Sequence, residues 1–128
     1  MIQAIHTAIA GLRVSAERLG VAANNIANAN SGGAVDPYDG YVPQRFEQST
    51  TAQGTPAGAV RPAAQPAYVL VYDPANSRAN ADGLVGLPNV DLPASIVELR
   101  IAEQSYKANL ATLRTASDMM KVLLDRTA

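Results

Sequence analysis

Apolar residues near the amino terminus recur in alternating steps of three and four, the spacing of one face of a helix. The pattern runs unbroken through eight positions, and such a seam is typical of helices that pack side by side in a coiled coil. We therefore predict a helix over residues 2–29 that packs against a partner helix. Its seam consists of Ile2, Ile5, Ile9, Leu12, Ala16, Leu19, Ala23 and Ile26.

A second stretch with the same periodicity lies near the carboxyl terminus, and Asn109 is the only polar member of its seam. The predicted helix over residues 93–126 would be about 50 Å long, and the first helix about 42 Å. Similar lengths favour an antiparallel pair of helices. The second seam consists of Leu99, Ala102, Tyr106, Asn109, Leu113, Ala116, Met120 and Leu123, and Ile96, Leu110 and Leu124 widen the apolar stripe.

Residues 31–91 hold seven of the nine glycines and seven of the eight prolines, so this middle segment interrupts the helical pattern. Residues 67–72 have the composition of a strand, and Leu84, Val85 and Leu87 offer a short second strand, so a small hairpin is expected. Residues 49–66 are rich in Ala, Thr, Gln, Gly and Pro, and we expect them to become ordered only against a neighbour.

These elements predict a mainly α fold in which two long terminal helices form an antiparallel coiled-coil hairpin. Residues 1–30 and 92–128 would make one discontinuous domain, and residues 31–91 an extended, partly β connecting segment. The second helix has two candidate starts: Asp91 or Leu92 just before Pro93, and a capping box from Ser95 to Glu98.

Composition excludes several classes of function. Ten basic against eleven acidic residues give a formal charge of −1, so no basic surface for nucleic acid is expected. Cysteine is absent and His6 is the only histidine, without an acidic neighbour in sequence, so we expect no catalytic site, metal, cofactor or small-molecule substrate. No apolar run is long enough to insert into a membrane, and the first residues do not resemble a cleavable signal peptide.

The predicted first helix is unusually poor in charge, because residues 1–30 carry only Arg13, Glu17 and Arg18. A helix that faces water normally has a charged outer face. We therefore expect the face opposite the seam to be buried against neighbouring subunits, with a generic alanine-rich helix as the alternative. The expected lateral subunit interface consists of Ala10, Gly11, Val14, Val21, Asn24, Asn25 and Asn28.

The predicted second helix carries many charges, several of them paired four residues apart. A solvated helix face is the simplest explanation. The sharper hypothesis is that this face borders a water-filled channel inside an assembly, with Glu103, Lys107, Arg114 and Lys121 as the channel-facing candidates.

The run Ala-Ala-Asn-Asn-Ile-Ala-Asn-Ala-Asn over residues 22–30 resembles the amino-terminal signature of bacterial flagellar axial proteins, the rod and hook families. The segments at 72–83, 88–91 and 105–109 are similar to the proximal-rod branch of that group, whereas residues 115–120 also resemble the distal rod and hook. The resemblance implies a type III export substrate that leaves the cytosol without signal cleavage and polymerises in the periplasm. Its partners would be copies of itself, other rod proteins and the flagellar export apparatus.

The sequence therefore predicts a structural subunit of the flagellar basal-body rod, not an enzyme. It would transmit torque and surround the export channel. Two alternatives remain at this point: a distal rod or hook homologue, and a soluble helical adaptor or export-binding module that uses the same seam for one partner helix.

Overall fold

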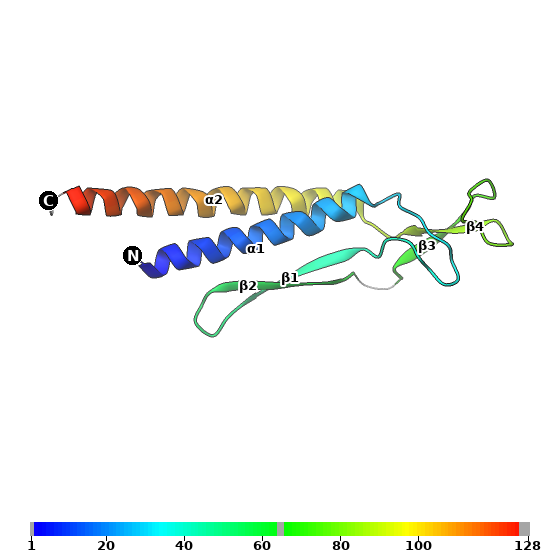
Figure 1. Cartoon of the computed structure of the whole chain (residues 1–128), viewed down its shortest axis with the longest axis horizontal. Helices are drawn as coiled ribbons and strands as arrows, with labels where there is room; N and C mark the ends of the chain where they lie inside the picture. The colour runs from blue at the N-terminus through cyan, green and yellow to red at the C-terminus, as the bar shows by residue number, and fades with distance from the viewer. Residues whose placement is uncertain (1, 64–65, 126–128) are drawn as a thin grey trace.

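The computed structural model describes residues 2–63 and 66–125. Helix α1 spans Ile2–Ala27 and helix α2 spans Leu92–Asp125, and four strands lie between them: β1 (Gln44–Thr50), β2 (Pro56–Pro62), β3 (Tyr68–Tyr72) and β4 (Leu84–Pro88). In Figure 1 the two helices run side by side in opposite directions, so that both chain ends lie at the same end of an elongated molecule. The predicted fold class, mainly α with two packed terminal helices, is confirmed.

Local signals explain where the helices begin and end. Asp91 caps α2, because its carboxylate oxygen Oδ1 accepts a hydrogen bond from the main-chain N–H of Ala94 at 2.9 Å. The rival start at Ser95 is not used. Helix α1 ends at Ala27, and a turn closes the chain behind it with a hydrogen bond from the N–H of Ser31 to the carbonyl of Asn28. Residue 1 and residues 126–128 of the predicted helical segments lie outside the described residues.

The predicted hairpin is present as β3 and β4, which pair antiparallel with Leu70 opposite Gly86. The structure also contains a hairpin that the sequence analysis missed: β1 pairs antiparallel with β2, with Phe46 opposite Val60. The sequence predicts that residues 49–66 become ordered only against a neighbour, and as far as residue 62 the neighbour in this structure is α1 of the same chain. Residues 64–65 lie outside the described residues.

The missed hairpin is held together by features that are invisible in a hydrophobicity pattern. The ring of Phe46 lies directly over Gly58, where even a methyl group would collide with it. Glu47 forms ion pairs with Arg45 on its own strand and with Arg61 across the sheet. Gly54 takes a positive φ of 75° in the connecting turn, a conformation that favours glycine.

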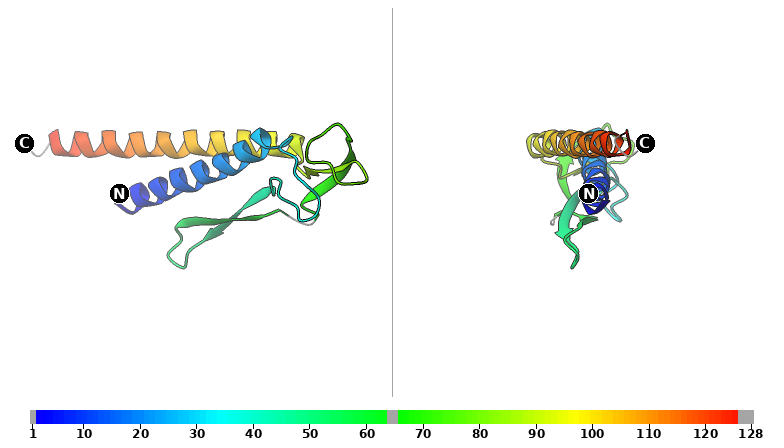
Figure 2. Two further views of the ribbon diagram at one scale, coloured as in Figure 1. Left: turned by 45° about the vertical axis from the view of Figure 1, so that its right-hand side comes forward. Right: turned by 90° about the vertical axis from the view of Figure 1, so that its left-hand side faces the viewer.

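The buried core of the helix pair is built from small side chains. Ala8, Ala22, Ala102 and Ala116 are buried together with Ser15, whereas many larger apolar side chains on both helices stay exposed. Figures 1 and 2 show the helices close together near the end of α1 and spreading apart toward its beginning. The chain therefore leaves much of its apolar surface uncovered.

Beyond the helix pair, the chain after α1 folds against the β3–β4 hairpin. Gly33 and Gly86 exchange main-chain hydrogen bonds of 2.9 and 3.0 Å, and the rings of Tyr38 and Tyr68 stack with their centroids 4.2 Å apart. A side chain at Gly86 would collide with the Tyr38 ring, so glycine permits this close stack. Burial raises the pKa of the Tyr38 hydroxyl, and the nearby Asp39 carboxylate raises it further.

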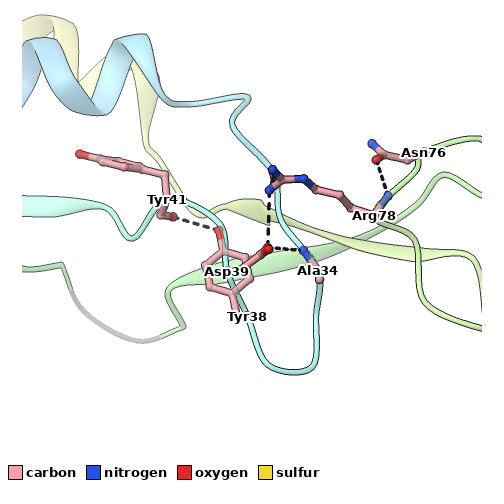
Figure 3. A network of polar contacts seen from close by, with 7 residues as sticks. Ala34, Tyr38, Asp39, Tyr41, Asn76 and Arg78 are labelled. Atoms are coloured by element: carbon pink, nitrogen blue, oxygen red, sulfur yellow. Dashed lines mark hydrogen bonds and ion pairs between the residues drawn. The ribbon is translucent and has the colours of Figure 1, made fainter.

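Figure 3 shows the polar contacts around this loop. The Asp39 carboxylate accepts a hydrogen bond from the N–H of Ala34 at 2.7 Å and forms an ion pair with Arg78 at 3.6 Å. The Tyr38 hydroxyl donates to the carbonyl of Tyr41 at 2.9 Å. The ion pair joins the loop after α1 to the segment between β3 and β4, and the two hydrogen bonds fix the shape of the loop itself.

Candidate assembly surfaces

The contact between the helices is made by the face of α1 that carries Ala8, Gly11, Ser15 and Ala22. At its centre Gly11 lies against Asn109 of α2, because a Cβ at position 11 would stand 2.6 Å from Asn109 Oδ1. Small residues at this face let the helix backbones approach closely. The polar member of the second seam therefore meets a glycine on the opposite helix.

An ion pair joins the helices near the end of α1. Arg18 Nε donates to Glu98 Oε2 at 2.6 Å, and the Arg18 side chain is three-quarters covered. Glu98 is thus used across the helix pair and not as the second half of a capping box. The pair fixes the register of α1 against the first turns of α2.

The predicted seam of α1 lies about one residue, or about 100°, around the helix from the face that meets α2. Ile2 is 70% exposed and Ile9 is 50% exposed, and Ala16 is exposed as well. Ile5, Leu12, Leu19, Ala23 and Ile26 are half-buried. Much of the apolar seam is therefore available at the surface of the single chain.

On α2 the predicted seam is divided in the same way. Ala102 and Ala116 are buried and Leu99, Asn109 and Leu113 are half-buried. Tyr106, Met120 and Leu123 are exposed. The buried and half-buried members lie along the part of α2 that packs against α1. The exposed members include those in the last turns of α2.

The face predicted to meet neighbouring subunits is partly covered by the chain itself. Gly11 faces α2, and Val14 and Val21 are buried, with the β1–β2 hairpin lying along this side of α1. Ala10 and Asn28 are half-buried and Asn24 is exposed. The low charge of α1 therefore has an explanation within one chain, because the β1–β2 hairpin packs on the side of the helix that does not meet α2.

Asn25 forms the polar contact between α1 and the start of the β1–β2 hairpin. Its amide Nδ2 donates to the carbonyl of Gln44 at 2.7 Å, and its Oδ1 accepts from the N–H of Gln44 at 2.9 Å and from the Tyr41 hydroxyl at 2.8 Å. The side chain thus pairs with the first residue of β1 as a neighbouring strand would. Sequence analysis selected Asn25 but not Tyr41 or Gln44, since a partner sixteen or nineteen residues away leaves no periodic signal.

The channel-facing candidates lie on one stripe of α2, because their steps of four and seven residues are close to whole helical turns. Lys107, Arg114 and Lys121 are exposed, and Glu103 is half-buried. Lys107 donates to Glu103 at 2.6 Å and Arg100 donates to it at 3.1 Å, and these hydrogen bonds lower the pKa of the Glu103 carboxyl. The stripe points away from the face of α2 that carries Ala102 and Ala116.

Other chemistry finds little support in the described part of the chain. No group of three or more acidic or histidine side chains gathers there in a way that would hold a metal ion. Among the residues described, neither helix is both long and apolar enough to cross a bilayer. His6 lies exposed on α1.

Comparison with known proteins gives relatives along nearly the whole chain. The flagellar basal-body rod protein FlgC of Salmonella typhimurium is 39% identical over 118 residues, which cover 88% of this chain and 88% of that protein. FlgC of Agrobacterium fabrum is 32% identical over 120 residues, which cover 90% and 86%. The chain belongs to the FlgC family of flagellar basal-body rod proteins. No family model matches the chain.

Membership of the FlgC family confirms the resemblance stated from residues 22–30, 72–83, 88–91 and 105–109, and it favours the rod over the hook. FlgC proteins are rod components, which agrees with the prediction of a structural protein and not an enzyme. The matched region covers 88% of this chain and 88% of the Salmonella protein, so the similarity extends well beyond these short segments.

For a FlgC family member, the last turns of α2 are the most conspicuous exposed surface. Met119, Met120, Val122, Leu123 and Leu124 are all exposed, and Leu124 is 69% exposed. Figure 1 shows this end of α2 extending past the beginning of α1. A helix that is apolar on several sides is normally buried, so this end is a candidate contact with other subunits.

Proposed function

We propose that this chain is a structural subunit of the proximal rod of the flagellar basal body, where it polymerises with copies of itself and other rod proteins. The rod transmits torque and surrounds the export channel. The observation that carries the proposal is the 39% identity to a FlgC protein over 88% of the chain. The uncovered apolar surface of the helix pair supports it, because a subunit of a continuous assembly is completed by its neighbours.

Two surfaces of the helix pair fit contacts between subunits. One is the exposed part of the α1 seam, represented by Ile2 and Ile9, and the other is the apolar end of α2. Both lie at the end of the molecule where the helices spread apart (Figure 2). Of the residues first expected at a lateral interface, Ala10, Asn24 and Asn28 remain suitable, since they are exposed or half-buried.

The charged stripe of α2 is proposed to face the export channel. Its members are Glu103, Lys107, Arg114 and Lys121. Because the stripe carries both positive and negative charges, it stays hydrated without creating a strong electrostatic field. The stripe lies on a different side of α2 from the contact with α1, so a subunit could present it to the channel while the helices stay paired.

The proposal includes export by the flagellar type III apparatus and a final location in the periplasmic rod. The small, alanine-based core supports export as an extended chain, because such a core offers little resistance to unfolding. The elongated shape supports packing side by side around a narrow axis (Figure 1).

The test is to make this chain, with a short internal tag, the only source of the rod subunit in a motile strain and to purify basal bodies. We expect the tag in the rod and a loss of swimming when the chain is absent. Complete basal bodies without the chain would contradict the proposal. Recovery of the chain only in a one-to-one complex of fixed size would favour the adaptor function instead.

A further inference from the structure

Each two-stranded sheet has two outer edges, where main-chain N–H and C=O groups point away from the partner strand. Unprotected edges pair with other chains, and proteins usually protect them with prolines, charges or a covering element. The two hairpins of this chain have four such edges. Among the described residues, the edges of β1 and β4 are bonded or covered, the edge of β2 leaves two outward positions between its prolines, and the edge of β3 leaves three.

The hydrogen bonds around β3 show which of its groups point outward. Asp73 donates to the carbonyl of Gly83, and Asn89 donates to the carbonyl of Ala67, so the odd-numbered positions bond across the hairpin. In an antiparallel pair the positions between them point to the other side. The N–H and C=O groups of Tyr68, Leu70 and Tyr72 therefore face the outer edge of β3.

The outer edge of β4 is fully occupied. Gly86 exchanges hydrogen bonds with Gly33, and Leu84 donates to the Asn80 side chain and accepts from the Asn80 N–H. Pro88 has no N–H to leave unpaired. These three positions are the counterparts of Leu70, Tyr72 and Tyr68 across the hairpin.

The first hairpin is protected in other ways. On β2 the outward positions begin and end with Pro56 and Pro62, which interrupt any ladder of hydrogen bonds. On β1 the N–H and C=O of Gln44 are bonded to the Asn25 side chain, and α1 lies beside the strand. Charged Arg45 and Glu47 add a further barrier to pairing.

The outward positions of β3 also stand between two prolines, Pro66 and Pro74, but three of them follow one another there, and no helix or third strand of the described chain lies against this edge. Its sequence, Tyr-Val-Leu-Val-Tyr, contains no charge and no proline. Leu70 is 55% exposed and Tyr72 is 71% exposed. Within residues 2–63 and 66–125, no hydrogen bond reaches the outward main-chain groups of Tyr68, Leu70 or Tyr72.

We propose that the edge of β3 receives an extended strand from another rod subunit, which pairs with Tyr68, Leu70 and Tyr72 through main-chain hydrogen bonds. The inference rests on the proposed function. The occupant is a strand because donors and acceptors that repeat every second residue match only an extended backbone. In a polar rod the contact is heterologous, so the strand comes from a different segment of the neighbour and not from its own β3.

Rates of amide hydrogen exchange should differ between the odd-numbered and the even-numbered residues of β3. In the isolated chain, the amides of Val69 and Val71 should exchange more slowly than those of Leu70 and Tyr72. In purified basal bodies, the amides of Leu70 and Tyr72 should slow by at least about tenfold, since pairing protects them as well. Unchanged exchange at Leu70 and Tyr72 in basal bodies that contain the chain would overturn the inference and leave the proposed function standing.

Substitutions at Leu70 give an independent test. Leu70→Pro removes one outward N–H and leaves the bonds across the hairpin in place, and Leu70→Lys keeps the N–H but adds a charge to the edge. Leu70→Thr is the matched control, because threonine keeps both the N–H and a high strand preference. We expect the first two variants to enter basal bodies at least about tenfold less than wild type, and the control to enter normally.

The protection of the Val71 amide in each isolated variant shows whether the β3–β4 hairpin is still formed. Normal incorporation of Leu70→Pro or Leu70→Lys would contradict strand pairing at this edge. Loss of incorporation in the Leu70→Thr variant with an intact hairpin would also contradict it, because the side chain and not the backbone would then carry the contact. Absence of the wild-type chain from the rod would refute the proposed function itself.

Discussion

At the scale of single residues, two polar side chains fix how the parts of the chain meet. Asn25 joins α1 to the start of β1 through three hydrogen bonds, and Asn109 fills the space above Gly11 between the helices. Neither contact follows from hydrophobic periodicity. At position 25 an apolar side chain would leave the main-chain groups of Gln44 without partners, whereas the Asn109 amide donates only to the Ser105 carbonyl of its own helix.

Replacing Asn25 with Asp should loosen the connecting segment from α1. The change removes the donor to the Gln44 carbonyl and places a carboxylate oxygen against it, at an expected cost of about 1–3 kcal/mol. Asn24→Asp is the matched control, because Asn24 is exposed and carries the same change of charge. Limited proteolysis between residues 30 and 44 should speed up in the first variant only. Equal cleavage of both variants would show that the hydrogen bonds of Asn25 contribute little.

The two glycines of α1 should respond in opposite ways to larger residues. A Cβ at position 20 would meet no atom beyond its own helix within 4 Å, so Gly20→Ala should raise the stability of the helix by about 0.5–1 kcal/mol. Gly11→Ala gains the same helix preference but must displace the Asn109 side chain, and Gly11→Leu should separate the helices. Circular dichroism at 222 nm during heating measures the difference. A stabilised Gly11→Leu variant would contradict the close contact at Gly11.

At the scale of elements, the β1–β2 hairpin covers the side of α1 that holds Val14 and Val21. Sequence patterns missed it because its strands contain glycine, proline and alternating charges in place of an apolar face. Its order depends on α1, on the Phe46 ring over Gly58 and on the Asn25 contact. A two-stranded hairpin alone is marginally stable in water, so the helix supplies the surface that orders it.

Gly58→Val should detach this hairpin from α1. A Cβ at position 58 would stand 2.0 Å from the Phe46 ring, so the ring must leave its place. Ala59→Val on the exposed neighbouring position is the control. Hydrogen exchange in β1 and β2 should accelerate in the first variant and stay unchanged in the second. Unaltered protection in Gly58→Val would mean that Phe46 does not hold the hairpin.

At the scale of the whole molecule, one end is held together by contacts between distant segments, and the other end carries exposed apolar surface. Arg18 and Glu98, Asn25 and Gln44, and the Tyr38–Tyr68 stack tie the chain together from the end of α1 to the distal hairpin. Toward the chain termini the helices spread and carry exposed apolar side chains (Figure 1). A member of the FlgC family therefore has a folded connecting region and a terminal region that fits completion by other subunits.

A charge at the apolar end of α2 should block assembly without unfolding the single chain. Val122 is 58% exposed, so Val122→Glu should change the helical content of the isolated chain little. In the rod the buried charge should prevent incorporation and abolish swimming. Ser117→Glu on an exposed polar position is the control for helix propensity and charge. Normal swimming of the Val122→Glu strain would exclude this end of α2 from the subunit contacts.

The sequence by itself determined the two helices, the β3–β4 hairpin and the resemblance to axial proteins, because periodicity, turn residues and a contiguous motif are local properties. It offered two starts for α2, and the structure selected the cap at Asp91. The sequence did not determine which face of α1 meets α2. The isoleucine seam and the face of small residues both repeat at helical spacing, and close backbone approach selected Ala8, Gly11 and Ser15. The β1–β2 hairpin and the partners of Asn25 were likewise decided by the tertiary structure, since contacts between distant segments depend on packing and leave no periodic trace.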